Sequence, residues 1–371
     1  MKRLFLVILA VGLLALGALG DRMFNPGGRT PAAAATPPSA PTAADAAAFT
    51  STTAALSSSA IDAATEHAYA VAAPSIVYVV NPGVGTGSGV VYDSKGDIVT
   101  NYHVVSGASK LSVTLNDGRV FSATVVGTDA ADDLAVIHTS ATNLTPAQFA
   151  SAGGYKVAQS VLAVGSPLGL KQSVAFGLIS GIHRVEQEPN GAYLPDALQT
   201  SAPINPGNSG GALVTLNGIV VGIPTLQQTT TQDGSTAQNI GFAIPSERVT
   251  FVANQIIASG KVTHTDRAYL GISPADSSAQ ASSGFGGFGP NNSTPSASGA
   301  LIQQLSSSGP AAKAGLQQGD VITQADGTTV TNASDLLTVL AQKKPGQSIT
   351  LKVDRNGSTL TVQAHLGELP A

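Results

Sequence analysis

Cysteine is absent from the 371 residues of this chain. A chain without thiols has no disulfide framework, no thiolate nucleophile and no thiol-ligated zinc or iron–sulfur centre. Charged residues are also scarce, at 11% of the chain, and 18 basic against 22 acidic residues give a net charge of −4. This balance lacks the basic excess that a phosphate backbone attracts, so nucleic acid is not expected as a partner.

Signatures of cofactor use are missing as well. The sequence has no Gly-x-x-x-x-Gly-Lys loop for nucleotide phosphates. Its histidines are scattered rather than clustered, whereas a zinc site needs several ligands close together. We therefore expect neither a cofactor nor a bound metal.

The N-terminus carries an export signal. Met1, Lys2 and Arg3 form a basic start, and residues 4–20 are then apolar or glycine. This run lies between the length of a membrane-spanning helix and that of a cleavable signal. Residues 1–22 are therefore predicted as a single-pass membrane anchor, with a removed signal and secretion as the alternative, and the rest of the chain is expected on the extracytoplasmic side. Residues 23–66, rich in Ala, Pro, Thr and Ser, are predicted as a flexible linker.

Residues 67–260 carry the pattern of a β-rich domain. Short β-branched runs alternate with Gly, Asn and Asp between residues 75 and 223, which is typical of barrels and sandwiches. A clear helical period appears at residues 246–259, where the apolar positions fall on one face. A mainly β fold, with a double β-barrel closed by one helix, fits this arrangement.

Three residues of this domain could perform nucleophilic chemistry. His103 follows a strand, Asp133 opens an apolar strand, and Ser209 lies in a Gly-rich turn. Each is most often structural when it stands alone, but in the order His, Asp, Ser they form the acyl-transfer constellation of chymotrypsin-type proteases. Asp132 is the neighbouring alternative to Asp133, and a shift of one residue would turn its carboxylate to the opposite face.

The segment around Ser209 also matches the Gly-x-Ser-x-Gly elbow of α/β-hydrolases. That elbow leads into a helix, whereas strand-like residues follow Gly210. The hydrolase histidine also comes last in the chain, where His264 and His365 belong to a later unit. A peptidase is therefore favoured over a lipid or ester hydrolase.

The chain resembles the HtrA (Deg) family of serine proteases in TNYHVV (100–105), DDLAVI (132–137), QTSAPINPGNSGGAL (199–213) and IGFAIP (240–245). The resemblance implies a chymotrypsin-type double β-barrel in which His103 is general base and acid, Asp133 orients it, and Ser209 is the nucleophile. The backbone amides of Gly207 and Ser209 are implied as the oxyanion hole. It also implies an ATP-independent endopeptidase of protein quality control or stress signalling, which acts on unfolded or regulatory polypeptides as a homotrimer.

Residues 261–371 resemble a small α+β PDZ domain of the permuted bacterial type. Within it, residues 275–298 are rich in Ser and Gly and are predicted as a flexible insertion. A sheet edge beside a helix can capture a peptide as an extra strand. We expect it to bind peptides with apolar C-termini, whose carboxylate is held by the backbone of Tyr269, Leu270, Gly271 and Ile272.

Two further features concern specificity and control. Residues 197–223 contain no Asp or Glu, and Ile204 resembles the apolar pocket residue of the family, with Gly241 and Phe242 as the neighbouring wall. Cleavage after small or medium aliphatic residues is predicted, because Lys or Arg would lose hydration without an ion pair. Residues 184–196 are predicted as a sensor loop. The alternative function is a peptide-binding chaperone in which the triad is rarely assembled.

Overall fold

The computed structural model describes residues 58–166, 173–187, 193–205, 207–227, 239–277 and 297–371. The predicted anchor, residues 1–22, lies outside these ranges, as does most of the predicted linker. None of the helices in the described ranges is both long enough and apolar enough to cross a membrane.

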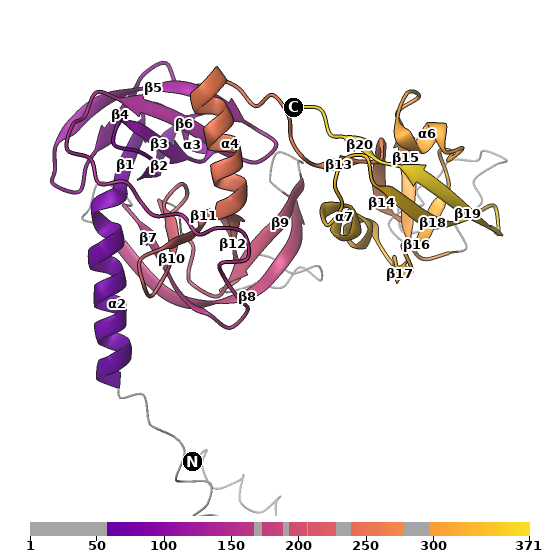
Figure 1. Ribbon diagram of the computed structural model, residues 1–371, viewed down its shortest axis with the longest axis horizontal. Coiled ribbons are helices and arrows are strands. Elements are labelled where there is room, and N and C mark those ends of the chain that lie inside the picture. The colour runs from indigo at the N-terminus through magenta and orange to yellow at the C-terminus, as the bar shows by residue number, and fades with distance from the viewer. Residues whose placement is uncertain (1–57, 167–172, 188–192, 206, 228–238, 278–296) are drawn as a thin grey trace, which may run out of the picture. The chain divides into compact units, whose positions relative to one another are not determined.

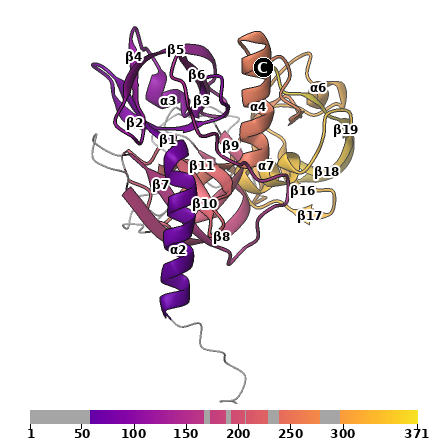
Figure 2. The ribbon, with the colours of Figure 1, turned by 60° about the vertical axis from the view of Figure 1, so that its left-hand side comes forward.

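The described chain begins with helix α2 (Ser58–Ala72), followed by the 3-10 helix η1 (Ala73–Ser75). The prediction of a linker up to residue 66 is therefore wrong for residues 58–66, which are helical. Alanine has the highest helix propensity, and Ala68 and Ala72 are buried against the barrel strands that follow. Figures 1 and 2 both show α2 running away from those strands towards the N-terminus.

The first barrel is closed, with the strand order β1-β2-β3-β6-β5-β4. Its strands are β1 (Ile76–Asn81), β2 (Gly85–Val91), β3 (Asp97–Thr100), β4 (Leu111–Thr114), β5 (Val120–Asp129) and β6 (Leu134–Thr139). The short helix α3 (Tyr102–Val105) follows β3. Buried aliphatic residues, among them Val77, Val79 and Ile98, fill the interior.

The second barrel is also closed, with the order β10-β11-β12-β9-β8-β7. Its strands are β7 (Ser160–Gly165), β8 (Ser173–Gln187), β9 (Tyr193–Thr200), β10 (Ala212–Thr215), β11 (Val220–Gln227) and β12 (Gly241–Pro245). Both ends of the predicted sensor loop, residues 184–187 and 193–196, belong to the paired strands β8 and β9. Residues 188–192 of that loop lie outside the described ranges.

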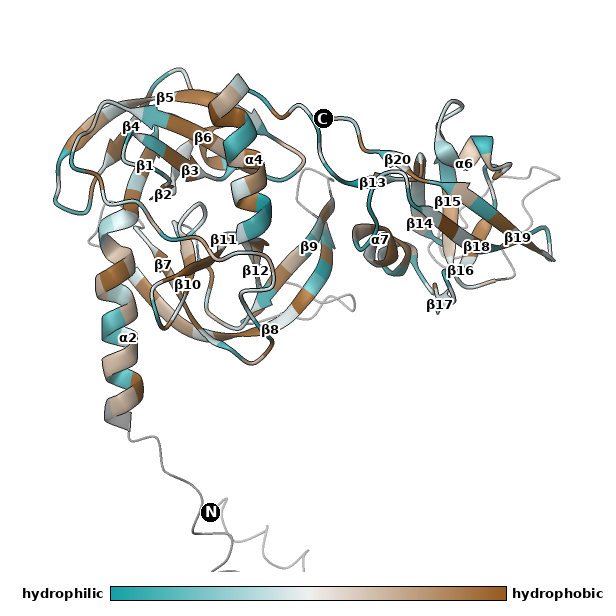
Figure 3. Ribbon diagram, viewed as in Figure 1, coloured by the Kyte–Doolittle hydropathy of each residue, from teal (hydrophilic) through white to brown (hydrophobic). Residues whose placement is uncertain are grey.

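Helix α4 (Ser246–Ser259) packs on strands of both barrels. Its buried residues Val249, Val252 and Ile256 join Phe242, Leu162 and Val136 in a core between the barrels. Figure 3 shows hydrophobic residues along the barrel strands and both hydrophobic and hydrophilic residues along α4. The predicted mainly β fold with two chymotrypsin-type barrels and one closing helix is confirmed.

The C-terminal part of the chain forms a second, smaller β-rich arrangement with its own core around Leu336, Ile349 and Leu351. Strands β13 (Ala268–Tyr269) and β20 (Gly367–Glu368) pair with each other, and a larger sheet has the order β14-β15-β16-β18-β19, with β17 beside β16. The elements are β14 (Ile272–Asp276), β15 (Ala300–Leu305), α6 (Pro310–Lys313), β16 (Val321–Ala325), β17 (Thr328–Thr329), α7 (Ala333–Ala341), β18 (Ser348–Arg355) and β19 (Ser358–His365).

The first residues of the predicted insertion, residues 275–298, belong to a strand. Ala275 and Asp276 are the last residues of β14 and pair with β15. Asp276 also accepts a hydrogen bond from the backbone amide of Ala333, at the start of α7, at 2.8 Å. Residues 278–296 lie outside the described ranges.

Candidate active site

His103 and Asp133 are joined by direct hydrogen bonds. His103 lies on α3, directly after β3, and Asp133 immediately precedes β6. The ring Nδ1 of His103 is 2.8 Å from Oδ2 and 3.0 Å from Oδ1 of Asp133, and the backbone amide of His103 donates to Oδ1 at 3.0 Å. The carboxylate is buried, whereas 48% of the His103 side chain is exposed. The carboxylate therefore holds the ring with Nδ1 turned inward and Nε2 on the opposite side.

The backbone at Asp133 fixes this arrangement. Asp133 has a φ of +49°, in the left-handed region that a residue with a Cβ seldom adopts. Its carbonyl oxygen accepts hydrogen bonds from the amide of Tyr102 at 3.1 Å and from Nδ2 of Asn101 at 2.9 Å. These bonds tie the start of α3 to the entrance of β6.

Ser209 lies in the loop before β10, and β2 of the first barrel anchors this loop. The amide of Ser88 donates to the carbonyl of Ser209 at 2.8 Å, and Oγ of Ser88 donates to the carbonyl of Gly207 at 2.6 Å. Gly210 has a φ of +79°, and a Cβ there would lie 2.2 Å from the carbonyl oxygen of Ser88. The glycine after the serine is therefore required by the close approach of two backbones.

Thr225, on β11, joins Ser209 to Asp133 and was not among the predicted site residues. Its Oγ1 donates to Oδ2 of Asp133 at 2.5 Å, and its carbonyl accepts from Oγ of Ser209 at 3.2 Å. The pairing of β11 with β12 shifts register around Thr225, which marks a β-bulge. A proline followed by a threonine within an otherwise apolar strand was the available sequence signal. The structure thus connects His103, Asp133 and Ser209 through one buried threonine.

The amides around Ser209 fall into two groups. Those of Asn208, Gly210 and Gly211 each donate to a backbone carbonyl, at 2.9 to 3.1 Å. Within the described residues, the amides of Gly207 and Ser209 donate to no acceptor. Gly207 has a φ of +103°. Two backbone donors therefore remain beside the serine for a ligand oxygen.

Two of the three predicted pocket residues, Ile204 and Gly241, lie together, whereas the side chain of Phe242 packs in a different core cluster. A Cβ at Gly241 would be 2.4 Å from Cγ1 of Ile204, so these two residues are in close contact. Ile204 is buried in the interior of the second barrel. The ring of Phe242 packs in the core between the barrels instead. Only the backbone of Phe242 therefore lies beside Gly241 and Ile204.

The predicted carboxylate-binding segment connects β13 to β14. Gly271 has a φ of +84°, and its carbonyl accepts from the amide of Ser306 at 2.9 Å. The carbonyl of Leu270 accepts from the amide of Ala311 at 2.8 Å. A cavity beside this segment is lined in part by Tyr269, Leu270, Gly271, Ile272, Leu337 and Leu340. The segment is therefore fixed next to an apolar stretch of α7.

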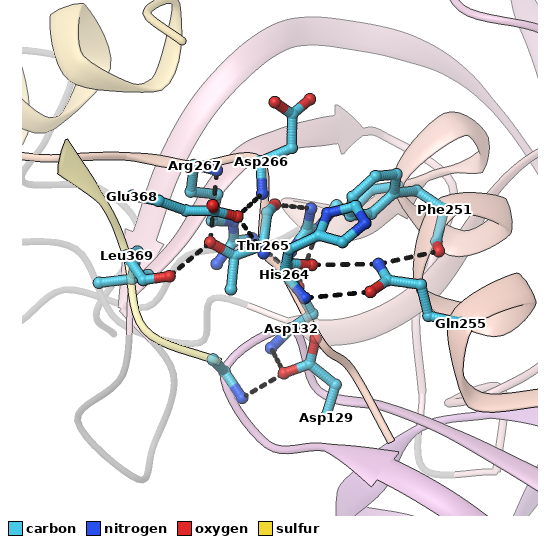
Figure 4. A network of polar contacts seen from close by, with 12 residues as sticks. Asp129, Asp132, Phe251, Gln255, His264, Thr265, Asp266, Arg267, Glu368 and Leu369 are labelled. Atoms are coloured by element: carbon cyan, nitrogen blue, oxygen red, sulfur yellow. Dashed lines mark hydrogen bonds and ion pairs between the residues drawn. The ribbon is translucent and has the colours of Figure 1, made fainter. Parts of the chain in front are cut away.

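Asp132, which Figure 4 labels together with Arg267, has partners different from those of Asp133. Arg248 Nε donates to Oδ2 of Asp132 at 2.8 Å, and the guanidinium groups of Arg248 and Arg267 form ion pairs with the two carboxylate oxygens. The Asp132 side chain has 0% exposure. Burial alone would raise the pKa of Asp132, but Arg267 and Arg248 hold it below its ordinary value. The alternative assignment of the orienting carboxylate to Asp132 finds no support in this geometry.

Asp129 lies at the start of the same turn. Its Oδ1 accepts from the amides of Ala131 and Asp132 at 3.1 and 3.3 Å, and its buried Oδ2 has no hydrogen-bond partner within the described ranges. Burial and the neighbouring Asp132 raise the pKa of Asp129 to about 7. The described residues contain no group of three or more Asp, Glu or His side chains that could hold a metal ion.

Known protein families match two parts of the chain. The family model of the trypsin-like peptidase domain matches residues 87–223, and that of the PDZ domain matches residues 268–366. The first match includes His103, Asp133 and Ser209, and the second includes the segment of Tyr269 to Ile272.

Named relatives match most of the chain. The serine endoprotease DegS of Escherichia coli (strain K12) is 37% identical over 312 residues, which span 81% of this chain and 84% of DegS. A probable periplasmic serine endoprotease, DegP-like, of Halomonas elongata is 40% identical over 284 residues, which span 76% of this chain and 56% of that protein.

Solved structures agree with these sequence matches. The HtrA-type protease AlgW with a tripeptide superimposes with a TM-score of 0.59 and 32% identity, over 83% of this chain and 98% of AlgW. The serine endoprotease from Yersinia pestis gives a TM-score of 0.55 and 33% identity, over 82% of this chain and 98% of that one.

Proposed function

Since the chain belongs to the HtrA (Deg) family of serine endoproteases, we propose that it is an ATP-independent peptidase of extracytoplasmic quality control or stress signalling. Its substrates are unfolded or regulatory polypeptides, and His103, Asp133 and Ser209 carry the reaction. The observation that supports this assignment most directly is the hydrogen-bond set of Asp133, which joins the His103 ring to Thr225 and so to the Ser209 hydroxyl.

The chemistry follows from these positions. Oγ of Ser209 attacks the peptide carbonyl carbon while Nε2 of His103 takes its proton, and His103 then protonates the leaving amine. Asp133 accepts the Nδ1–H bond, which keeps Nε2 basic and stabilises the imidazolium that forms. The amides of Gly207 and Ser209 donate to the oxygen that becomes negative in the tetrahedral intermediate. Water then releases the acyl group by the same steps.

Replacement of the nucleophile tests this assignment. Ser209→Ala should abolish cleavage of an unfolded protein such as casein while leaving the fold intact, because the alcohol forms the acyl intermediate. Cleavage rates and circular dichroism of the full chain measure both effects. Turnover equal to that of the wild type would refute the triad, and binding of casein without Ser209-dependent cleavage would favour the chaperone function instead.

We further propose an uncharged specificity pocket formed by Ile204, Gly241 and the backbone of Phe242. The contact of Ile204 with Gly241 supports a short apolar cavity, so cleavage should follow Val, Ala or Leu. Matched tetrapeptides that differ in the cleaved residue test this assignment. A highest kcat/KM for Lys or Arg would exclude it.

We propose that the PDZ domain captures peptides with apolar free C-termini. The fixed carbonyls of Leu270 and Gly271 hold the carboxylate-binding segment beside α7, and a peptide carboxylate there would accept hydrogen bonds from the segment's amides. Calorimetry with an acid and its amide tests the claim, since equal affinities would exclude a carboxylate pocket.

The remaining assignments concern organisation. We propose residues 1–22 as a membrane anchor, 67–260 as the protease domain, 261–371 as the PDZ domain, and a homotrimer with these domains on the extracytoplasmic side. The basic start and apolar run of the N-terminus support the anchor, and the periplasmic naming of the Halomonas relative supports the compartment. Membrane fractionation and light scattering of the solubilised chain test the anchor and the oligomer.

A further inference from the structure

Ser88, on β2 of the first barrel, is a buried serine that takes no part in the proposed reaction steps. Its exposed fraction is 0%. Its hydroxyl donates to the carbonyl of Gly207 at 2.6 Å and accepts from the amide of Ser166 at 2.8 Å. Its amide donates to the carbonyl of Ser209 at 2.8 Å. One residue of the first barrel therefore binds two carbonyls of residues 207–211, the nucleophile loop of the second barrel.

The two carbonyls belong to the peptide groups on either side of the one that carries the Ser209 amide. A peptide group is planar, so a bond to its carbonyl also fixes its amide. At the other ends of these two groups, the amides of Asn208 and Gly210 donate to backbone carbonyls at 2.9 and 3.1 Å. The group between them is held at its carbonyl, since Asn208 accepts from the amide of Gly211 at 2.9 Å. Its amide, that of Ser209, is left for a ligand oxygen.

Ser88 itself is fixed to the strand that leads to His103. The carbonyl of Ser88 accepts from Oγ1 of Thr100, a residue of β3 with 0% exposure, at 2.6 Å. Strand β3 pairs with β2 and is followed by α3, which carries His103. Ser88 therefore lies between the strand before His103 and the nucleophile loop, and its own bonds prevent it from following a movement of that loop.

The nucleophile loop needs such an external contact because its own sequence does not restrict it. Gly207 and Gly210 have φ values of +103° and +79°, and glycine has more backbone freedom than any other residue. Local sterics therefore do not set the direction of the peptide groups around Ser209. An oxyanion hole works only when its donors are directed in advance at the position where negative charge develops. The bond from Ser88 to Gly207 can supply this direction.

We propose that Ser88 is a positioning residue for the oxyanion hole, acting through the carbonyl of Gly207. The bond from its hydroxyl holds the peptide group between Gly207 and Asn208, so that the amides of Gly207 and Ser209 converge on the oxygen of the tetrahedral intermediate. The inference rests on the proposed function, because it assumes that Ser209 is the nucleophile and that these two amides stabilise the oxyanion.

The experiment compares variants of the full chain that differ in one hydroxyl group. Ser88→Thr and Ser88→Val have side chains of the same shape, so any crowding by the added methyl group is common to both, and only the donor differs. Ser88→Ala removes the hydroxyl without adding volume. Ser246→Ala is the matched control, because Ser246 is also 0% exposed and its hydroxyl donates to the carbonyl of Ala150 at 2.9 Å, at the start of α4.

Two measurements separate the oxyanion hole from the rest of the site. Steady-state kinetics on a short chromogenic peptide give kcat and KM. The inhibition constant Ki of a peptide aldehyde of the same sequence reports on the oxyanion hole, because addition of the Ser209 hydroxyl to the aldehyde places an oxygen where the tetrahedral intermediate has one. Circular dichroism gives the folded fraction to which each rate is normalised.

Ser88→Ala should lower kcat about ten- to a hundredfold, less than the removal of an oxyanion donor itself, with KM little changed. The Ki of the aldehyde should rise by a similar factor, which a loss of global stability alone would not cause. Ser88→Val should behave like Ser88→Ala, whereas Ser88→Thr should exceed Ser88→Val in kcat by about tenfold, because it keeps the donor. Ser246→Ala should lose some stability but leave kcat and Ki within about a factor of two.

Three results would overturn the proposal. These are equal kcat in Ser88→Thr and Ser88→Val, a fall in kcat without a rise in Ki, and losses of the same size in Ser246→Ala. If the added methyl group prevents folding of both larger variants, kcat and Ki of Ser88→Ala decide by the same criteria. If wild-type cleavage did not depend on Ser209, the proposed function would fail, whereas Ser209-dependent cleavage with an unchanged Ki in Ser88→Ala would reject this inference alone.

Discussion

The first barrel contains two histidine–aspartate pairs that are nearly alike. In one, His103 Nδ1 lies 2.8 Å from Asp133, and in the other, His138 Nδ1 lies 2.9 Å from Asp97. The exposed fractions of the two histidine side chains are 48% and 46%. Distance and exposure therefore do not distinguish the proposed catalytic pair from the other pair.

The difference lies in what else the carboxylate binds. Asp133 also accepts from the amide of His103 and from the buried hydroxyl of Thr225, whose carbonyl accepts from the hydroxyl of Ser209. Asp97 and His138 face each other across β3 and β6 as an ordinary cross-strand pair. A histidine–aspartate pair points to catalysis when additional buried donors fix the carboxylate and a nucleophile is connected to it.

The largest expected difference between the two pairs is the loss of activity when each aspartate is replaced. Asp133→Asn should lower kcat/KM by about 10⁴-fold, as for other orienting carboxylates, because the amide favours the wrong imidazole tautomer. Asp97→Asn should leave kcat/KM within about a factor of two, because the pair joins β3 to β6 and neither residue belongs to the proposed triad. Steady-state kinetics on one peptide substrate measure both variants. Comparable losses in the two variants would mean that the pairs are not functionally different.

Sequence patterns predicted much of this arrangement. His103, Asp133 and Ser209 each stand beside a short β-branched run, and such runs identify strands even where pairing is unknown. The hairpin between β18 and β19 turns at Asn356 and Gly357, a dipeptide that favours a type I′ turn, and both residues have the positive φ that such a turn requires. Local signals of this kind need no knowledge of distant contacts.

The features that sequence reasoning missed depend on distant contacts. Thr225 is 92 positions from Asp133 in the chain, so nothing local connects them. Helix α2 has an Ala-rich sequence like that of the linker before it, and its burial at Ala68 and Ala72 comes from tertiary packing. Strand β9 contains Pro195 and Asp196, residues that are depleted in strands, and it pairs with β8 and β12 despite them.

A smaller loss of activity is expected when the hydroxyl of Thr225 is removed. Thr225→Val keeps the shape of the side chain and the carbonyl that Ser209 uses, but removes the hydroxyl donor to Asp133. Loss of a hydrogen bond to a charged group should lower kcat roughly ten- to a hundredfold, with KM little changed.

The matched control is Thr139→Val, because Thr139 is also buried and donates to the carbonyl of Ser122 on the neighbouring strand β5. It should lose some stability but no activity. A normal kcat in Thr225→Val, or equal activity losses in both variants, would show that the threonine does not set the geometry of Asp133.

The smallest expected effect is a dependence of stability on pH. It comes from Asp129, in the turn before Asp133, and not from the strand that carries Asp97. Burial, first, and the charge of Asp132, second, raise the pKa of Asp129 to about 7 from 3.8. Asp129 therefore holds a proton in the folded chain that it loses in the unfolded chain above about pH 4. Its contribution to stability is fully present below that pH and is lost as pH rises through 7.

Between pH 6 and pH 8, the wild-type chain should lose about 1 kcal/mol of unfolding free energy relative to Asp129→Asn, which has no proton to release. Arg248 and Arg267 form ion pairs with the neighbouring Asp132 carboxylate, and their positive charges partly oppose the rise in the pKa of Asp129. Asp132 keeps its charge because both arginines hold its pKa low. Urea unfolding at the two pH values measures the difference between the chains. A parallel pH response of the two chains would mean that Asp129 is already ionised at pH 6, and its carboxylate would then be a second buried charge beside Asp132.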